Sequence, residues 1–146
     1  MANILLLNGP NLNLLGTREP DKYGNDHLED IIKKCRKIAD SHGHNLTDFQ
    51  SNSEHELVEK IHLTKNDLID FILFNPAAFT HTSIVLRDAL LAVNVPFIEI
   101  HLSNISAREE YRNKSYFSDI AQGCIFGLGS VGYELAVSAA CKIIGN

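Results

Sequence analysis

The sequence predicts an α/β fold built on a parallel β-sheet with helices on both faces. Two observations support this prediction. Short and almost continuously apolar segments recur along the 146 residues, for example Asn3–Leu7 and Leu68–Phe74. Between them lie segments with apolar residues at helical spacing, for example residues 28–39. Apolar strands that alternate with helices are typical of a parallel sheet covered on both faces.

The first half of the chain holds three predicted strands and two predicted helices. In order they are a strand at Asn3–Leu7, a helix at 28–39, a strand at Asn45–Gln50, a helix at Glu54–Thr64 and a strand at Leu68–Phe74. We expect Asn25 or Asp26 to cap the first helix and Gly43 to lie near its end, because short polar side chains favour helix starts and glycine favours helix ends. The start of the chain has no basic segment, so it is predicted to be a strand and not a signal peptide.

The second half continues the alternation. In order it holds a helix at Ser83–Val93, a strand at Val95–His101, a short helix at Ala107–Arg112, a strand at Gly123–Leu128 and a helix at Val131–Ile144. Five β/α units at this length predict a flavodoxin-like doubly wound five-stranded parallel sheet with strand order 2-1-3-4-5. We expect residues 1–146 to form a single catalytic domain, for the chemical reasons given below.

Composition argues against several classes of protein. The formal net charge is −5 and the basic residues are dispersed, whereas a nucleic-acid-binding protein needs a basic stripe. No apolar stretch approaches the roughly 20 residues that span a membrane. Cys35, Cys124 and Cys141 have unrelated spacings, which match neither a disulfide framework nor a zinc motif. We therefore expect buried thiols in a reducing cytoplasm, with no bound metal, nucleic acid or membrane.

A long loop punctuated by glycine and proline follows the first strand. Loops of this length are usually binding loops, lids or disordered linkers. This one carries an amide (Asn11), a guanidinium (Arg18) and a phenol (Tyr23), and its composition is unlike that of a linker. Gly16 and Gly24 bracket the last two, as the hinges of a moving flap would. We predict that it is a catalytic loop.

Polar residues also follow the other predicted strands. They are Gln50–Asn52 after the second strand, Asn75–His81 after the third, His101–Asn104 after the fourth, and Arg112 further along. In a doubly wound sheet, ligands bind beyond the carboxyl ends of the strands. The sequence therefore predicts a polar cleft at this edge.

The residue types in this cleft suggest acid–base chemistry. Glu99 and His101 are two apart in a predicted strand, so their side chains point to the same face. A carboxylate beside an imidazole fixes its tautomer and raises its pKa, which suits a general acid near neutral pH, although a purely structural ion pair is the alternative. Tyr23 can act as a base at pH 7 if a cation such as Arg18 or Arg112 favours its phenolate. We predict proton abstraction from carbon, with Tyr23 as base and His101 as acid.

Three further features each have two interpretations. Ser103 and Asn104 offer a hydroxyl and backbone N–H groups for a carboxylate-sized anion, or they only cap a short helix. His81 is interpreted as a substrate contact or proton donor rather than a metal ligand, because its neighbours are hydroxyls and amides. Asp88, taken alone, is predicted to be an exposed helix residue.

The segment Gly127–Gly132 has the pattern G-x-G-x-x-G between a strand and a helix. A dinucleotide site needs this pattern early in a βαβ unit, with an acidic residue about 20 positions further on. Here only one helix follows before the last residue of the sequence, so we predict a tight turn with close helix–sheet packing. No NAD and no other cofactor is expected.

Four motifs spread over the chain resemble those of one enzyme family. They are N-G-P-N-L-N-L-L-G-T-R-E-P at 8–20, N-P-A-A-F-T-H-T-S at 75–83, E-I-H-L-S-N-I-S-A-R-E-E-Y-R at 99–112 and G-L-G-S-V-G-Y at 127–133. In this combination the chain resembles the type II 3-dehydroquinate dehydratases of the shikimate and quinate pathways. Differences are mild: Ala77 stands where that family also commonly has glycine, and Tyr111 where it usually has phenylalanine. The resemblance implies reversible dehydration of 3-dehydroquinate to 3-dehydroshikimate without metal, cofactor or Schiff base.

The resemblance also implies a role for each catalytic residue. Tyr23 removes the proton from C2, next to the C3 ketone, and gives an enolate. Arg18 favours ionised Tyr23, and Asn11 helps to hold a water at the enolate oxygen. His101, oriented by Glu99, then protonates the departing C1 hydroxyl.

Substrate binding and assembly follow from the resemblance in the same way. The residues implied to contact the substrate are Asn75, His81, Leu102, Ser103, Arg112 and Asp88. Asp88 would come from a neighbouring subunit of a dodecamer of four trimers. Two alternatives stay open at this point: another cofactor-free lyase or isomerase acting on a polyhydroxylated keto acid, and a flavodoxin-like binding module without enzymatic activity.

Overall fold

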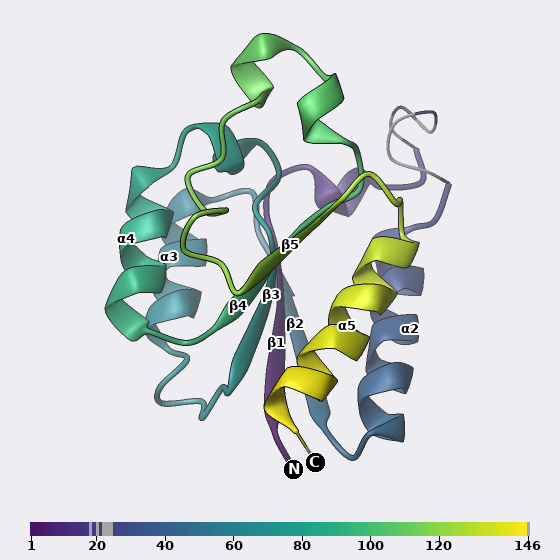
Figure 1. Cartoon of the computed structure of the whole chain (residues 1–146), viewed down its shortest axis with the longest axis vertical. Coiled ribbons are helices and arrows are strands. Elements are labelled where there is room, and N and C mark those ends of the chain that lie inside the picture. The colour runs from purple at the N-terminus through teal and green to yellow at the C-terminus, as the bar shows by residue number, and fades with distance from the viewer. Residues whose placement is uncertain (18, 20, 22–24, 146) are drawn as a thin grey trace.

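The structure is a computed structural model that describes residues 1–17, 19, 21 and 25–145, so the predicted catalytic residues Arg18 and Tyr23 lie outside the described residues. A five-stranded parallel sheet forms its centre, in the order β2-β1-β3-β4-β5 (Figure 1). The strands are β1 (Asn3–Asn8), β2 (Asn45–Gln50), β3 (Phe71–Asn75), β4 (Phe97–His101) and β5 (Gly123–Phe126). The predicted fold class and strand order are confirmed.

Helices cover both faces of the sheet. They are α2 (Leu28–Ser41), α3 (Glu54–His62), α4 (Ile84–Val93) and α5 (Val131–Ile144). Helices α2 and α5 pack side by side on one face, and α3 and α4 on the other (Figure 1). Among the described residues, no helix has the length and apolar character needed to cross a membrane.

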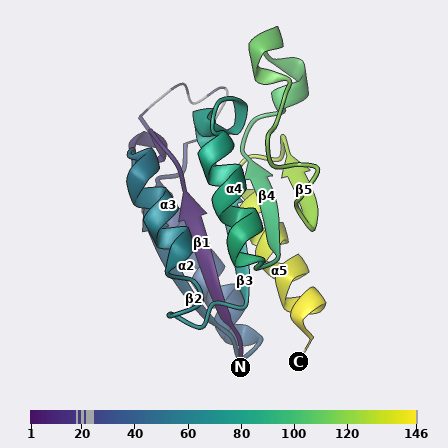
Figure 2. The ribbon, with the colours of Figure 1, turned by 90° about the vertical axis from the view of Figure 1, so that its left-hand side faces the viewer.

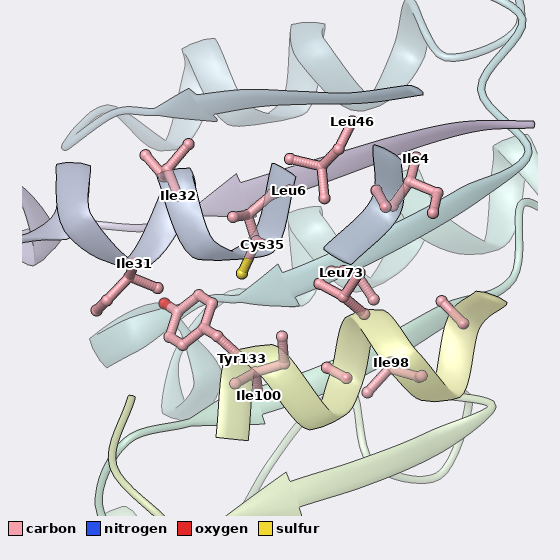
Figure 3. Packing of buried hydrophobic residues seen from close by; sticks show 14 of the residues in the cluster. Ile4, Leu6, Ile31, Ile32, Cys35, Leu46, Leu73, Ile98, Ile100 and Tyr133 are labelled. Atoms are coloured by element: carbon pink, nitrogen blue, oxygen red, sulfur yellow. The ribbon is translucent and has the colours of Figure 1, made fainter. Parts of the chain in front are cut away.

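The side chains of the strands alternate between two cores. Leu6, Leu73 and Ile100 point toward α2 and α5, where Tyr133 is also buried (Figure 3). Leu7 and Phe74 point the other way, into a core shared with α3 and α4. Because both of their faces are buried, the central strands β1, β3 and β4 are apolar along most of their length, as the sequence predicted, whereas the edge strands β2 and β5 are partly exposed.

Several predicted boundaries were wrong by a few residues. Helix α2 is capped by His27, whose backbone N–H donates to Asp30 Oδ2 at 3.3 Å, and not by Asn25 or Asp26. The carboxylate of Asp26 instead accepts a hydrogen bond from Ser130. Strand β3 begins at Phe71 because Leu68 is exposed and has a left-handed backbone with φ 54°.

The predicted helix over Ala107–Arg112 was also wrong. Two separate 3-10 turns take its place, η3 (Ile105–Ala107) and η4 (Glu110–Arg112), which project beyond the carboxyl ends of the strands (Figure 2). Two more 3-10 turns, η1 (Leu12–Leu14) and η2 (Ala77–His81), lie at the same edge of the sheet. Both termini lie at the opposite edge (Figure 1).

The glycine motif behaves as a turn with close packing, as predicted. Gly127 and Gly129 have φ values of 81° and 62°, which favour glycine. A Cβ atom on Gly132 would lie 3.2 Å from Cγ2 of Ile125, so the absence of a side chain lets α5 approach β5.

The prediction of buried thiols holds for two cysteines. Cys35 and Cys141 are buried, whereas Cys124 is exposed because it lies on the edge strand β5.

Candidate active site

A cleft lies beyond the carboxyl ends of β1, β3 and β4. Its lining residues are Pro10, Asn11, Leu12, Asn75, Ala77, Ala78, His81, His101, Leu102, Ser103, Ile105, Arg108 and Arg112. The predicted site residues Asn11, Asn75, His81, His101, Leu102, Ser103 and Arg112 are thus brought together at one cleft. None of the described residues that line it carries a negative charge, so the cleft favours an anionic ligand.

Glu99 and His101 form a buried pair behind this cleft. They end strand β4 on the same face, and His101 Nε2 lies 2.6 Å from Glu99 Oε2. Glu99 is fully buried and His101 is 4% exposed. A carboxylate can only accept, so Nε2 carries a proton and Nδ1 is the nitrogen that exchanges protons with a ligand. His101 also packs edge-on against Phe126, with ring centroids 5.2 Å apart.

Glu99 stays ionised despite its burial. Burial alone would raise the pKa of Glu99, but hydrogen bonds from His101, Ser118 and Ser115 outweigh it and hold this pKa below its usual range. The ionised carboxylate accepts the proton on His101 Nε2 and so fixes the tautomer of the ring. The pair therefore has the features of a general acid held in one tautomer.

His81 faces the cleft from η2, and it differs from His101 in which ring nitrogen carries the proton. Its Nδ1 lies 2.7 Å from the backbone carbonyl of Lys114, which can only accept, so Nδ1 carries the proton. Burial lowers the pKa of His81 below its usual value, although the Lys114 carbonyl opposes this shift. At neutral pH the ring is therefore neutral, and its Nε2 is an acceptor for a ligand hydroxyl.

Asn75 is held by a buried hydrogen-bond chain that no pattern in the sequence indicates. Asn75 Nδ2 donates to the hydroxyl of Tyr133 at 2.8 Å, and this hydroxyl donates to Asn8 Oδ1 at 2.7 Å. Asn75 Oδ1 accepts from the backbone of Ala77 at 3.1 Å. Ala77 has φ 53°, a conformation that glycine adopts more easily, so this bond helps to hold it. The orientation of the Asn75 amide in the cleft is fixed by these contacts.

We expect Tyr133→Phe to lower the free energy of unfolding by about 2–4 kcal/mol. The change leaves Asn8 Oδ1 and Asn75 Nδ2 buried without this partner, and each unsatisfied group costs about 1–3 kcal/mol. Urea denaturation would measure the loss. Tyr111→Phe is a matched control, because Tyr111 is 69% exposed and its variant should unfold like the wild type. A Tyr133→Phe protein of unchanged stability would contradict the role of this chain.

Two arginines line the outer part of the cleft. Arg112 Nε donates to Glu109 Oε2 at 2.6 Å, which fixes the guanidinium at the end of η4. Arg108 was not predicted to be a site residue, although it lies in the motif at 99–112. Its Nη1 lies 3.5 Å from Ser103 Oγ. Asn104 caps η3 by accepting from the backbone of Ser106, so of the predicted anion-binding pair only Ser103 lines the cleft.

Asn11 is held at the mouth of the cleft by its backbone. Its N–H donates to Asn52 Oδ1 at 2.9 Å, and Asn52 also accepts from Gln50. Asn11 has φ 69°, a left-handed conformation that asparagine tolerates better than most residues. The polar residues after β1 and β2 thus converge, as predicted.

A family model described as dehydroquinase class II matches residues 2–141. The chain belongs to this family. The 3-dehydroquinate dehydratase of Thioalkalivibrio sulfidiphilus is 64% identical over 143 residues, which are 98% of this chain and 97% of the relative. That of Ectopseudomonas mendocina is 61% identical over 97% of this chain and 96% of the relative.

Solved structures agree with the fold. The type II dehydroquinase of Propionibacterium acnes matches with a TM-score of 0.91 at 40% identity, over 97% of each chain. That of Butyrivibrio crossotus also has a TM-score of 0.91, at 38% identity over 94% of this chain and 96% of the other. The resemblance predicted from the four motifs is confirmed, as is the flavodoxin-like sheet of a class II dehydroquinase.

One predicted contact residue of the dehydroquinase lies away from the cleft. Asp88 is exposed on α4, as its position in the helix predicted, and lines a separate hollow beside Arg87, Lys114 and Asp119. It therefore does not reach the cleft of its own chain. A contact with a bound ligand would require a neighbouring subunit.

Proposed function

We propose that this chain is a type II 3-dehydroquinate dehydratase, which eliminates water reversibly from 3-dehydroquinate to give 3-dehydroshikimate. The observation that carries the proposal is the buried Glu99–His101 pair at a positively charged cleft, in a chain of the dehydroquinase family. The products of such a reaction belong to the shikimate pathway and so to aromatic amino acid biosynthesis.

The proposed reaction has two proton transfers. The Tyr23 phenolate removes a proton from C2, and the electron pair moves to the C3 oxygen to give an enolate. Arg18 favours ionised Tyr23, and Asn11 holds a water at the enolate oxygen. The enolate then collapses, the C1–C2 double bond forms, and the C1 hydroxyl leaves as water with a proton from His101. Preorganised donors aimed at a developing oxyanion are often the largest contribution, about 3–4 kcal/mol each.

The remaining cleft residues are proposed to hold the substrate. Its carboxylate accepts from the Ser103 hydroxyl and from the backbone amides of Leu102 and Ser103. Asn75, fixed by Tyr133, provides a further contact. The neutral Nε2 of His81 accepts from a ring hydroxyl, and Arg112 binds a second one.

Assembly completes the proposal. Asp88 faces outward, which fits a contribution to the site of a neighbouring subunit in a homododecamer of four trimers. The exposed apolar residues Ile84, Val85 and Leu91 lie on the same helix and would be covered in such an assembly. We place the enzyme in the cytoplasm, as a single catalytic domain.

The test is to mix purified protein with 3-dehydroquinate and follow the ultraviolet absorbance of the conjugated enone of 3-dehydroshikimate. We expect rapid turnover that survives EDTA, and that survives borohydride treatment of the enzyme with substrate. Loss of activity with EDTA would require a metal, and loss after borohydride would require an imine. A folded protein without turnover would contradict the proposed substrate and favour another polyhydroxylated keto acid or a binding function.

A further inference from the structure

The carboxylate of Glu99 has more hydrogen-bond donors than a His–Glu pair requires. Its Oε2 accepts from His101 and also from Ser115 Oγ at 2.8 Å. Its Oε1 accepts from Ser118 Oγ at 2.5 Å and, more weakly, from Cys124 Sγ at 3.6 Å. The two serines lie 16 and 19 residues beyond Glu99, in the connection between η4 and β5.

The direction of the Ser115 bond is set by its surroundings. Ser115 Oγ accepts from the backbone N–H groups of Phe117 at 3.0 Å and Ser118 at 3.2 Å. A hydroxyl has one proton and two acceptor positions, so the proton of Ser115 is left for Glu99. A proton on Glu99 Oε2 would need an acceptor, and Ser115 has no acceptor position left for it. The arrangement therefore disfavours a proton on Oε2, the oxygen that faces His101.

The segment that carries these serines is firmly anchored. Phe117 is fully buried and meets Phe74 edge-on, with ring centroids 5.4 Å apart. Tyr116 donates from its backbone to Thr80 at 3.0 Å. Arg87 binds both carboxylate oxygens of Asp119 at 2.6 and 2.9 Å. The serine hydroxyls are thus held in place before any ligand enters.

We propose that Ser115 and Ser118 are positioning residues for the acid, because they hold Glu99 ionised and aimed at His101 Nε2. This inference rests on the proposed function, in which His101 protonates the leaving hydroxyl. A carboxylate held in this way keeps the Nε2 proton on the far side of the ring, so that Nδ1 delivers the proton to the substrate. The hydroxyls touch no ligand in this scheme and act through Glu99.

The test is a double-mutant cycle between Ser118 and Glu99. Ser118→Ala removes a hydroxyl that donates to Glu99 and leaves the backbone bonds of Ser115 intact. We expect it to lower kcat about tenfold with KM within twofold in the wild-type background, since hydrogen bonds to a charge are among the stronger ones. In a Glu99→Gln background, the same change should lower kcat less than twofold. Equal losses in both backgrounds would overturn the inference, because they would show that Ser118 acts independently of Glu99.

A second readout does not depend on turnover. The ¹⁵N shifts of the His101 ring in the ligand-free protein report which nitrogen carries the proton. For the neutral ring we expect the proton on Nε2 in the wild type and a mixture of tautomers in Ser115→Ala/Ser118→Ala; an unchanged tautomer would overturn the inference. Ser41→Ala, which removes a hydroxyl-to-carbonyl bond at the far end of α2, should match the wild type. If the folded wild type does not turn over 3-dehydroquinate, the proposed function fails instead, while the ¹⁵N result still decides on the serines.

Discussion

Replacing His101 by asparagine is expected to lower kcat by about 10³-fold while KM changes only a few-fold. Asparagine keeps a polar side chain of similar reach but has no group that titrates near neutral pH. Without the acid, the C1 hydroxyl must leave as hydroxide, and general acid catalysis typically contributes about 10²–10⁴-fold. The enone assay at saturating 3-dehydroquinate measures kcat directly, and its concentration dependence gives KM.

The matched control for this variant is His55→Asn. The His55 side chain is 78% exposed on α3, where it pairs with Glu59 at 3.1 Å, so its loss should leave kcat unchanged. A His101→Asn enzyme with near wild-type kcat would remove His101 from the role of acid. It would also leave the buried Glu99 carboxylate as a structural ion-pair partner, the alternative that the sequence left open.

The fold was predictable because local signals and global topology agree. The runs around Leu5 and Ile72 are apolar on consecutive residues, which is typical of strands buried on both faces. The predicted start of a helix was wrong where a side chain makes a contact that the local sequence does not indicate. Asp26 looks like a cap, yet its carboxylate accepts from Ser130, which is 104 residues away in the sequence.

The candidate site was predictable where its residues follow strand ends. Asn75 is the last residue of β3 and His101 is the last residue of β4. Because these parallel strands are neighbours, the sheet brings both residues to the same edge. The supporting contacts were not predictable, because they join segments far apart in the chain. Tyr133 reaches Asn8 across 125 residues, and nothing in a helical apolar pattern marks its hydroxyl as the centre of a hydrogen-bond chain.

Arg108 lines the cleft, but the sequence does not distinguish it as a site residue. It lies in the motif after β4, where the family resemblance indicates Arg112. The distinction depends on two consecutive 3-10 turns, which place both guanidiniums along the cleft. A helix over the whole segment, as the sequence predicted, would place the two side chains one turn apart on one face.

The second large effect is expected from Tyr23→Phe, which should lower kcat by at least about 10³-fold with ligand binding nearly intact. Phenylalanine keeps the ring and removes only the oxygen that takes the C2 proton in the proposed reaction. The α-proton of a ketone is a weak acid, so water cannot substitute for a positioned phenolate. Turnover is measured with the enone assay, and calorimetric titration with 3-dehydroshikimate gives the dissociation constant, which should stay within about threefold of the wild type.

Tyr111→Phe separates the loss of a phenol from the loss of the base. Tyr111 lies on η4 with the Arg112 guanidinium 5.2 Å from its ring centroid, a contact that phenylalanine retains. The change removes a hydrogen bond from the Tyr111 hydroxyl to Glu109, but Glu109 keeps its bond to Arg112. Its variant should therefore keep wild-type kcat. If Tyr23→Phe retained comparable activity, the phenolate would not be the base, and the neutral imidazole of His81 would be the remaining described group in the cleft able to accept the C2 proton. If both kcat and binding were lost in Tyr23→Phe, the phenol would contribute to substrate binding as well as to proton transfer.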